Sequence, residues 1–353
     1  MIRIVVDAKL HVNGLPRALG EAVREALTLP NPAHVSALRG GRWGGNIPET
    51  VSLFEEESDG RVILPRGHLE ALKARLERAR LRYEVQDRRL DLRRVGLRFH
   101  GSLRPHQARA LEALTRYGSG LVVAPPGSGK TVLAMALLAH WRRPALLLCH
   151  TKDLAVQLAE NVRRFLQVEP GFVGDGSWNP GEKVTVALVQ SLTRHPDWTA
   201  WLARRMGLVL LDEAHHAPAV TFTEVIQSFP AAFRYGLTAT PERRDGLGPF
   251  VEAVIGPVRA RVTAQDLEEE GQRVRPRLRW VETGFWYDYA DDYTAMLAAL
   301  VEDPERNELI VDLAAGEVAR GCRTLILTER VAHARALAEA LERRFPGKVT
   351  ALT

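Results

Sequence analysis

The segment Ala124-Pro-Pro-Gly-Ser-Gly-Lys-Thr131 constrains the fold of this 353-residue chain more than any other part of its sequence. It follows the apolar run Gly120–Ala124 and precedes Val132–Ala139, which has the composition of a helix. A glycine-rich turn between a buried strand and a helix gathers backbone N–H groups at the positive end of the helix dipole. The segment therefore predicts a phosphate-binding loop within an α/β domain.

The residues of this loop have separate predicted tasks. Gly127 and Gly129 let the backbone turn its N–H groups inward. Lys130 is expected to reach the β- and γ-phosphates of a nucleotide, and the Thr131 hydroxyl to bind Mg²⁺. Ala124 stands where such loops usually begin with glycine, and the alternative is an ordinary Gly/Pro turn before a helix. The Gly-Lys-Thr ending favours a nucleotide site, with the contacts Pro126, Gly127, Ser128, Gly129, Lys130 and Thr131.

Two carboxylates follow a second apolar run, in Leu208-Val-Leu-Leu-Asp-Glu-Ala-His215. Four apolar residues place Asp212 and Glu213 at the carboxyl end of a buried strand, where α/β sheets bind ligands. Asp212 is expected to hold Mg²⁺, and Glu213 to orient and deprotonate an attacking water. With Lys130 they form the predicted catalytic set. A strand that ends in Asp-Glu is common by itself, and its position about 80 residues after a phosphate loop gives it weight.

Apolar runs alternate with amphipathic segments from about residue 100 onward, which predicts a parallel sheet covered by helices on both faces. We expect four parts: a small α+β nucleic-acid-binding module (1–95), an α/β nucleotide-binding domain (96–260), a connector (261–305) and the start of a second, incomplete α/β domain (306–353). The predicted strands of the main domain are Gly120–Ala124, Ala145–Cys149, Val184–Val189, Leu208–Leu211 and Arg234–Leu237, with helices at Val132–Ala139 and Lys152–Phe165.

The flanking parts have weaker local patterns. In the first module we expect a strand at Ile2–Val6, helices at Leu15–Thr28 and His68–Arg80, a hairpin of Val51–Phe54 with Arg61–Leu64, and a closing segment Leu81–Val85. Residues 256–305 have an irregular, charged sequence, with one helix expected near Tyr293–Val301. The last part predicts helices at Asn307–Arg320 and Val331–Arg344 and strands at Thr324–Thr328 and Lys348–Leu352. Two strands and two helices are too few for a stable doubly wound domain, so the chain is expected to be truncated.

Composition and charge limit the kinds of partner and the cellular compartment that we expect for this chain. No apolar run approaches the roughly 20 residues that cross a membrane, and two cysteines, Cys149 and Cys322, fit a reducing, cytoplasmic setting. The net charge is +5, yet residues 61–109 hold 14 Lys and Arg against 5 Asp and Glu. Such a segment suggests a polyanion partner. The alternative is a solvated, arginine-rich helix face.

Several motifs together resemble the superfamily 2 helicases. Asp212-Glu-Ala-His215 is similar to motif II of their DEAH-box members, whose motor domains have a RecA-like fold. Leu103-Arg-Pro-His-Gln107 resembles the adenine-reading motif, which implies a base contact by Gln107 with Arg104 nearby. The resemblance implies ATP with Mg²⁺ as the bound nucleotide. It also implies the further nucleic-acid and coupling residues Thr151, Gln190, Ser191, His215, Thr238, Thr240 and Arg243.

These residues come from recognisable segments. Leu148–Lys152 and Ala187–Ser191 look like the loops with which the family touches the nucleic-acid backbone. Gly236-Leu-Thr-Ala-Thr-Pro241 resembles motif III, which links nucleotide state to grip on the nucleic acid, with His215 as a relay. Arg243-Arg-Asp-Gly resembles the XPB-like branch, which has Arg-Glu-Asp there. Arg39-Gly-Gly-Arg-Trp43 and Leu64-Pro-Arg-Gly67 resemble the first domain of UvsW-type phage helicases. Trp43 is either a base-stacking or a core residue.

The resemblance implies a DNA helicase or translocase that hydrolyses ATP to ADP and phosphate, moves 3′ to 5′ and remodels single-stranded, duplex or branched DNA in repair or recombination. The family's catalytic arginines lie late in the second domain, so we expect poor hydrolysis by this chain alone. Three alternatives stay open: a motor subunit of a restriction or defence system with a nuclease partner, an ATP-switched binding module without turnover, and RNA as substrate. A repair protein is a further possible partner.

Overall fold

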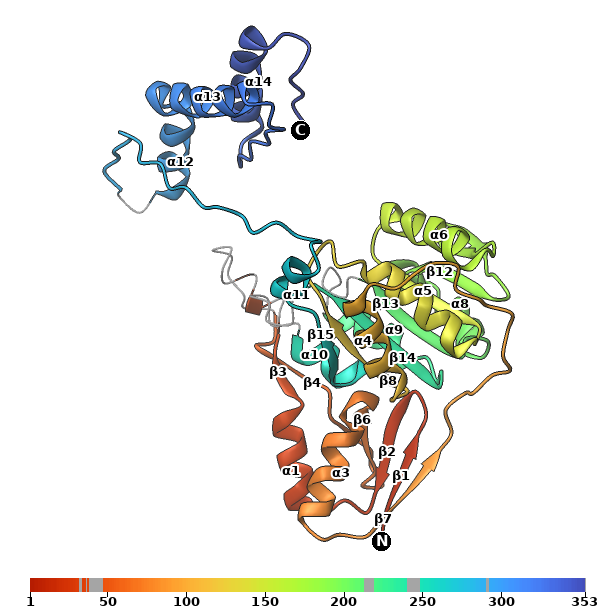
Figure 1. Cartoon of the computed structure of the whole chain (residues 1–353). Coiled ribbons are helices and arrows are strands. Elements are labelled where there is room, and N and C mark those ends of the chain that lie inside the picture. Colours follow the sequence, from red (N-terminus) through yellow and green to blue (C-terminus); the bar gives the residue numbers. More distant parts are fainter. Residues whose placement is uncertain are drawn as a thin grey trace. The chain divides into compact units, whose positions relative to one another are not determined.

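The computed structural model describes the chain apart from residues 32–33, 36, 38–46, 213–218, 240–247, 290–291 and 353. The chain divides into two compact units, Met1–Arg275 and Pro276–Thr353. The first unit contains a five-stranded sheet and an eight-stranded sheet, each with its own helices (Figure 1). Among the described helices, none combines the length and the apolar character needed to cross a bilayer.

The smaller sheet belongs to the N-terminal module and has the strand order β5-β6-β2-β1-β7. Its strands are β1 (Ile2–Val6), β2 (Lys9–Asn13), β5 (Glu55–Glu56), β6 (Val62–Pro65) and β7 (Tyr83–Asp87). Only the β1–β7 pair among these is parallel. Helices α1 (Arg17–Ala26) and α3 (Leu69–Arg78) pack on it (Figure 1), and Leu72 and Leu76 of α3 are fully buried. The helices and the strand Ile2–Val6 are therefore confirmed.

The predicted hairpin of the N-terminal module has the wrong first strand. The turn at Ser58–Gly60 exists, with Gly60 at a φ of +79°. The partner of β6 across this turn is β5, whereas β4 (Thr50–Ser52) pairs with β3 (Thr28–Pro30). The apolar residues Leu53 and Phe54 made Val51–Phe54 look like the inner strand, but both are buried outside any ladder. The hydrophobic core of the module buries both side chains, and this burial does not require strand pairing.

The larger sheet has the order β11-β10-β12-β9-β13-β14-β8-β15, and all of its pairs are parallel except β10–β11. This confirms the α/β fold with a parallel sheet. The five predicted strands are present as β8 (Ser119–Val123), β9 (Ala145–Cys149), β12 (Val184–Leu188), β13 (Leu208–Asp212) and β14 (Phe233–Thr238). The sheet also contains β10 (Gly171–Gly174), β11 (Ser177–Asn179) and β15 (Val258–Arg261).

Helices cover both faces of this sheet, which explains why a central strand such as β9 is apolar and buried at every position. Leu147 and Cys149 face a core formed with α4, α5 and α6, whereas Leu146 and Leu148 face one formed with α7, α8, α9 and α10 (Figure 1). The helices on the first face are α4 (Pro105–Thr115), α5 (Lys130–Trp141) and α6 (Lys152–Leu166). Those on the second face are α7 (Val189–Arg194), α8 (Pro196–Ala203), α9 (Ala219–Gln227) and α10 (Gly248–Ile255).

The segment after α10 is more regular than its charged sequence predicted. It forms the strand β15, which extends the sheet beside β8, and then helix α11 (Ala264–Glu269). Thr263 and Asp266 form a reciprocal capping box at the start of α11, and Leu267 is buried in the core of the large sheet. The capping box is a sequence signal for this helix that the charge pattern obscured.

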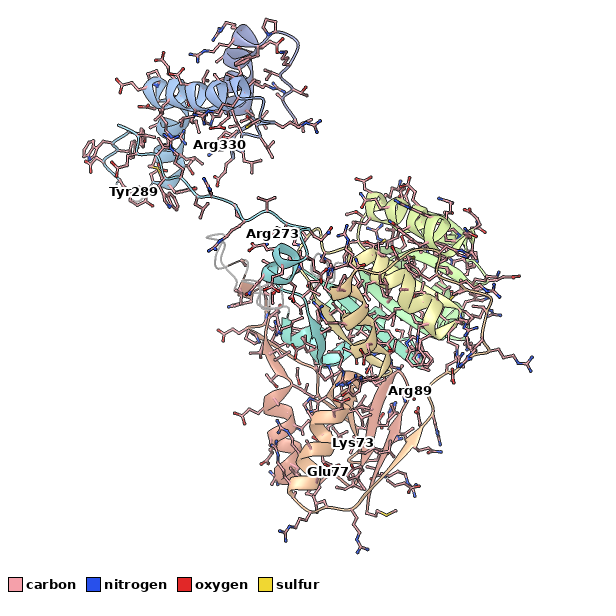
Figure 2. All side chains as sticks on the ribbon, viewed as in Figure 1. Lys73, Glu77, Arg89, Arg273, Tyr289 and Arg330 are labelled. Atoms are coloured by element: carbon pink, nitrogen blue, oxygen red, sulfur yellow. The ribbon has the colours of Figure 1, made fainter. Side chains whose placement is uncertain are left out.

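Two buried arginines join the N-terminal module to the larger sheet. Arg66 donates to the carbonyl of Ala231 at 2.6 Å, and Arg234 donates to the carbonyl of Ala8 at 3.0 Å. Burial is the main cause that lowers the pKa of both guanidinium groups, followed by repulsion from nearby arginines. Arg89, labelled in Figure 2, adds a contact to the carbonyl of Ala232 at 3.4 Å. The module and the sheet also share one hydrophobic core, so the joint is both apolar and hydrogen-bonded.

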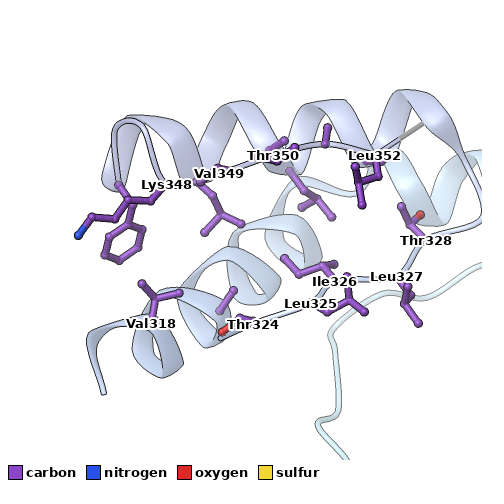
Figure 3. Close-up of a pocket in the computed structure, with 17 residues that line it drawn as sticks. Val318, Thr324, Leu325, Ile326, Leu327, Thr328, Lys348, Val349, Thr350 and Leu352 are labelled. Atoms are coloured by element: carbon purple, nitrogen blue, oxygen red, sulfur yellow. The ribbon is translucent and has the colours of Figure 1, made fainter. Parts of the chain in front are cut away.

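The described part of the second unit contains three helices, α12 (Tyr293–Glu302), α13 (Pro304–Ala319) and α14 (Val331–Arg344), as predicted. The predicted strands Thr324–Thr328 and Lys348–Leu352 are wrong, because neither segment has a ladder partner in the described part of this unit. Both segments instead line a cavity of about 290 Å³ beside α13 and α14 (Figure 3). A parallel strand forms only when a neighbour satisfies its backbone groups, and apolar sequence alone does not supply one.

Gly67 provides a test of the joint between the module and the larger sheet. A Cβ atom at this position would lie 2.6 Å from the carbonyl oxygen of Ala253 and from the backbone nitrogen of Gly256, beside α10. We expect Gly67→Ala to lower the melting temperature and to speed proteolysis around residues 88–96, because the backbone of α10 has to move away. Gly20→Ala, in the open interior of α1, is the matched control and is expected to be neutral or slightly stabilising. Equal behaviour of the two variants would contradict this tight joint.

His68 provides a pH test of the same region. Burial, with a smaller effect of the Arg75 charge, lowers the pKa of His68 from 6.5 to about 4. The unfolded chain therefore binds a proton on His68 at higher pH than the folded chain does. The contribution of neutral His68 to the free energy of unfolding is fully present above about pH 6.5. As the pH falls towards 4, the free energy of unfolding decreases by about 3 kcal/mol. We expect urea unfolding of His68→Gln to lose correspondingly less stability between pH 7 and 4 than the parent, and parallel curves would contradict the assignment.

Candidate nucleotide and nucleic-acid sites

The predicted phosphate-binding loop joins the end of β8 to the start of α5. Gly127 and Gly129 have φ angles of +81° and +74°, a region that favours glycine. Gly129 is the residue that precedes the first turn of α5, so the loop delivers its backbone N–H groups to the positive end of that helix. The helix beyond the loop is almost wholly buried, from Leu133 to Leu138. A rigid, buried helix thus fixes the position of the loop.

Lys130 lies across this loop. Its Nζ atom donates to the carbonyl of Ala124, at the opposite end of the loop, at a distance of 3.1 Å. The N–H of Ala124 in turn donates to the carbonyl of Thr238 at 2.9 Å, which ties the loop to the end of β14. The Ser128 hydroxyl oxygen is buried and has no hydrogen-bond partner among the described residues. The loop therefore presents an ammonium group, backbone donors and a hydroxyl within one turn of chain, as binding of a phosphate chain requires.

The strand order brings Asp212 and Thr238 to the same edge as the loop. Because β8, β14 and β13 are parallel neighbours, Val123 pairs with Thr238 and Leu237 pairs with Asp212. Asp212 and Thr238 are both 7% exposed. Burial, and to a smaller extent the negative charge of Asp212, raise the pKa of the Cys149 thiol at the end of the adjacent strand to about 12. This cysteine is consequently a neutral core residue.

The expected nucleic-acid residues Thr151, Gln190 and Ser191 lie farther along this edge, after β9 and β12. The Thr151 hydroxyl accepts the N–H of Leu154 at 3.2 Å and caps α6. The Ser191 hydroxyl accepts the N–H of Asp175 at 3.1 Å, at the tip of the β10–β11 hairpin. An ion pair joins that Asp175 to Lys152. Both hydroxyls thus fix the backbone of turns at the carboxyl edge, and contact with a nucleic acid stays a prediction.

Gln107 contacts the phosphate loop directly. Its Oε1 atom accepts the N–H of Arg104 at 2.9 Å, and its Nε2 atom donates to the carbonyl of Ser128 at 2.9 Å. The side chain is 4% exposed, and the Arg104 backbone forms the start of α4. Gln107 therefore braces the loop through its amide. Its expected contact with a nucleotide base, and the nearby role of Arg104, stay predictions.

Two further residues of this site, His106 and Glu270, were not predicted from the sequence. His106 is 2% exposed and contacts both Glu270 and the carbonyl of Ser128. His106 stands next to Gln107 in the motif, but its partner Glu270 lies 164 positions away. No local pattern links residues so distant, although the capping box of α11 marks the helix that carries Glu270 to this place. The expected residues Glu213, His215, Thr240 and Arg243, together with the segment Arg39–Trp43, lie outside the described residues.

Comparison with known proteins identifies relatives of the central domain. Residues 100–243 match the family model described as "Type III restriction enzyme, res subunit". The DNA 3′-5′ translocase XPB2 of Sulfurisphaera tokodaii is 31% identical over 165 residues, which are 47% of this chain and 37% of the relative. The probable helicase D10 of Escherichia phage T5 is 28% identical over 237 residues, 64% of this chain and 48% of the relative. The chain thus spans less than half of the length of these two relatives.

A solved structure shares the fold. The UvsW helicase from bacteriophage T4 superimposes with a TM-score of 0.56 at 15% sequence identity, over 98% of this chain and 73% of the other. A second structure of the same helicase gives a TM-score of 0.55, over 73% of this chain and 99% of the other. At this identity the likeness concerns the fold, and it supports a RecA-like arrangement of the large sheet.

The two loop glycines provide a graded test of this geometry. An alanine at either position is strained by roughly 1–2 kcal/mol because of the positive φ. At Gly127 no atom lies within 4 Å of the added Cβ, whereas at Gly129 the Cβ would collide with the Gln107 amide. We expect Gly129→Ala to weaken binding of a fluorescent ATP analogue much more than Gly127→Ala does. The added substitution Gln107→Ala is expected to recover part of the loss. Identical losses in both single variants would show that the Gln107 brace has no role.

Proposed function

We propose that this chain is part of an ATP-driven DNA helicase or translocase. The premise is that it belongs to the superfamily 2 helicases of the XPB and UvsW type. The observation that carries the proposal is the shared carboxyl edge of β8, β14 and β13. At this edge lie the phosphate loop with Lys130 at the start of α5, Thr238 at the end of β14 and Asp212 at the end of β13. A nucleotide site at this edge agrees with the similarity to the XPB2 translocase and the D10 helicase.

The proposed hydrolytic site assigns each residue one task. The loop N–H groups and the Lys130 ammonium bind the phosphate chain of ATP. The Thr131 hydroxyl and the Asp212 carboxylate would hold Mg²⁺, since both are oxygen ligands of the kind this ion prefers and both stand at the same sheet edge. When bound, Mg²⁺ supplies positive charge that offsets the charge on the phosphates. Glu213, next to Asp212 in sequence, would orient and deprotonate the attacking water.

The proposed DNA path runs along the rest of the carboxyl edge. Thr151 and Ser191 lie at turns that follow β9 and β12, and Gln190 precedes Ser191 in the first turn of α7. Backbone and hydroxyl donors at such turns suit phosphate groups and read no base edges. Thr238 at the end of β14 lies between the phosphate loop and Asp212, and we assign to it the link between nucleotide state and DNA grip. Movement from 3′ to 5′ and a role in repair or recombination belong to the same proposal.

A second candidate function is the motor subunit of a restriction or defence system. The description of the matching family model, a restriction-enzyme subunit, favours it. The nucleotide chemistry would be the same, and the two candidates differ in the nuclease partner that the second requires. Co-purification of the chain with a nuclease from its own host would favour this second function.

ATP hydrolysis measured by phosphate release, with and without single-stranded, duplex and branched DNA, tests the proposal. We expect slow hydrolysis by this chain alone, and hydrolysis stimulated by DNA when a polypeptide that carries the family's catalytic arginines is added. Lys130→Ala is expected to weaken ATP binding about ten- to hundredfold, because it removes a charge-assisted contact worth roughly 1.5–3 kcal/mol. Asp212→Asn is expected to abolish the Mg²⁺ dependence. Lys183→Ala is the matched control, since this exposed lysine precedes β12 in the same domain.

Three results would contradict the proposal in different ways. Stimulation by RNA and not by DNA would change the substrate. ATP-dependent DNA binding without hydrolysis, even when the catalytic arginines are supplied, would favour a nucleotide-switched binding module. An unchanged ATP affinity in Lys130→Ala would remove the nucleotide site from this loop.

A further inference from the structure

A buried ion pair connects the phosphate loop with the segment where the chain leaves the first unit. Glu270 directly follows α11, and its two carboxylate oxygens both contact His106. One oxygen accepts the backbone N–H of His106 at 2.9 Å, and the other lies 2.6 Å from ring atom Nδ1. His106 is 2% exposed and the Glu270 side chain is 15% exposed. This two-point contact fixes α11 relative to the start of α4.

The other side of the His106 ring faces the phosphate loop. Its Nε2 atom lies 2.8 Å from the carbonyl oxygen of Ser128. A carbonyl only accepts hydrogen bonds, and so does an ionised carboxylate. Both ring nitrogens therefore have to donate, which requires the doubly protonated, cationic imidazole. A buried cation of this kind needs a counter-ion, and Glu270 supplies it.

The surrounding charges are consistent with this state. The groups that face the pair are Arg109 of α4, 3.4 Å from Glu270, and Asp266 of α11, 3.4 Å from the same arginine. Burial acts to raise the pKa of Glu270, but hydrogen bonds and charge from His106 and then Arg109 lower it below its ordinary value. The carboxylate therefore stays ionised next to the imidazolium.

The contact with Ser128 determines the direction of a loop peptide. The Ser128 carbonyl accepts from His106 and also from Gln107, at 2.8 and 2.9 Å. In a planar trans peptide the carbonyl and the following N–H point in opposite directions. Holding the Ser128 oxygen against α4 consequently turns the N–H of Gly129 away from α4. The orientation of this phosphate-loop donor thus depends on His106, and through His106 on Glu270.

The position of Glu270 along the chain gives the contact a second consequence. Leu267 anchors α11 in the core, and the backbone N–H groups of Gln272 and Arg273 both donate to the carbonyl of Leu267. The first unit ends shortly afterwards, at Arg275. Glu270 is therefore among the last residues held by the nucleotide-binding domain before the chain continues into the second unit.

We propose that Glu270 and His106 are positioning residues that couple the phosphate loop to the exit of the chain from the nucleotide-binding domain. Glu270 holds His106 in its cationic form, and His106 orients the Ser128–Gly129 peptide toward a bound phosphate. Coupling free energies are reciprocal, so a bound nucleotide strengthens the hold of the domain on α11. This inference rests on the proposed nucleotide site and names residues that regulate it.

Substitutions that remove one side of the relay at a time provide the test. His106→Asn retains a donor near the Nδ1 position and keeps the contact with Glu270, whereas His106→Gln retains a donor near Nε2 and keeps the contact with Ser128. Glu270→Gln removes the counter-ion. Glu269→Gln is the matched control, because Glu269 is an exposed neighbour whose side chain accepts a hydrogen bond from Gln265. Circular dichroism and melting temperature establish that each variant is folded.

The first readout is nucleotide affinity, measured with ADP and with adenosine. We expect Glu270→Gln and His106→Asn each to weaken ADP binding about tenfold, as loss of a charged hydrogen bond does, while adenosine binding is unchanged. The double variant is expected to be no weaker than either single variant, since both break one relay. His106→Gln is expected to retain more ADP affinity than His106→Asn. Glu269→Gln is expected to stay within about twofold of the parent.

The second readout is hydrogen exchange of the α11 amides with and without ADP. We expect ADP to slow exchange over residues 264–272 in the parent and in Glu269→Gln, and to have no such effect in Glu270→Gln. A purely structural ion pair would change the exchange rate in Glu270→Gln equally with and without ADP, which would overturn the proposal. Parental ADP affinity in both Glu270→Gln and His106→Asn would also overturn it. Absence of ADP binding by the parent chain would instead overturn the nucleotide site on which the proposal rests.

Discussion

The insertion of β14 between β8 and β13 is the constraint on which the rest of the first unit depends. Parallel pairing aligns the carboxyl ends of these strands, so that the phosphate loop, Thr238 and Asp212 meet at one edge. The pairing is strongly specified because helices bury both faces of the sheet, and a shift in register would displace every core side chain. The site is therefore as rigid as the core beneath it. The phosphate loop and Asp212 come from segments about 80 residues apart in the sequence.

Charged side chains are buried at both boundaries of the nucleotide-binding domain, and they are stabilised in two different ways. At the N-terminal joint, Arg66 and Arg234 donate to backbone carbonyls, and burial lowers their pKa values. At the exit, His106 has a full counter-ion in Glu270. Backbone carbonyls accept the hydrogen bonds that these two arginines donate across the first joint. The second contact adjoins the phosphate loop, so its strength can depend on the nucleotide.

The carboxyl edge of the large sheet also suggests how nucleotide and nucleic acid are connected. The loop, Thr238 and Asp212 occupy one stretch of it, and the turns with Thr151 and Ser191 occupy the next. Neighbouring parallel strands link the two stretches, since β13 pairs with β9 and β9 pairs with β12. A displacement at one stretch therefore reaches the other through hydrogen-bonded backbone.

The sequence alone determined the features that depend on near neighbours: the phosphate loop, the five apolar strands, most helices and the residues Lys130, Thr131 and Asp212 as candidates. These follow from local turn chemistry and from periodicity over a few residues. The tertiary structure decided what depends on distant partners. It placed β15 in the sheet, paired β5 with β6, left Thr324–Thr328 and Lys348–Leu352 without ladders, and brought Glu270 to His106. Strand pairing and buried ion pairs are formed between segments separated by up to 164 positions, and no local pattern encodes such contacts because their free energy arises only when the chain is folded.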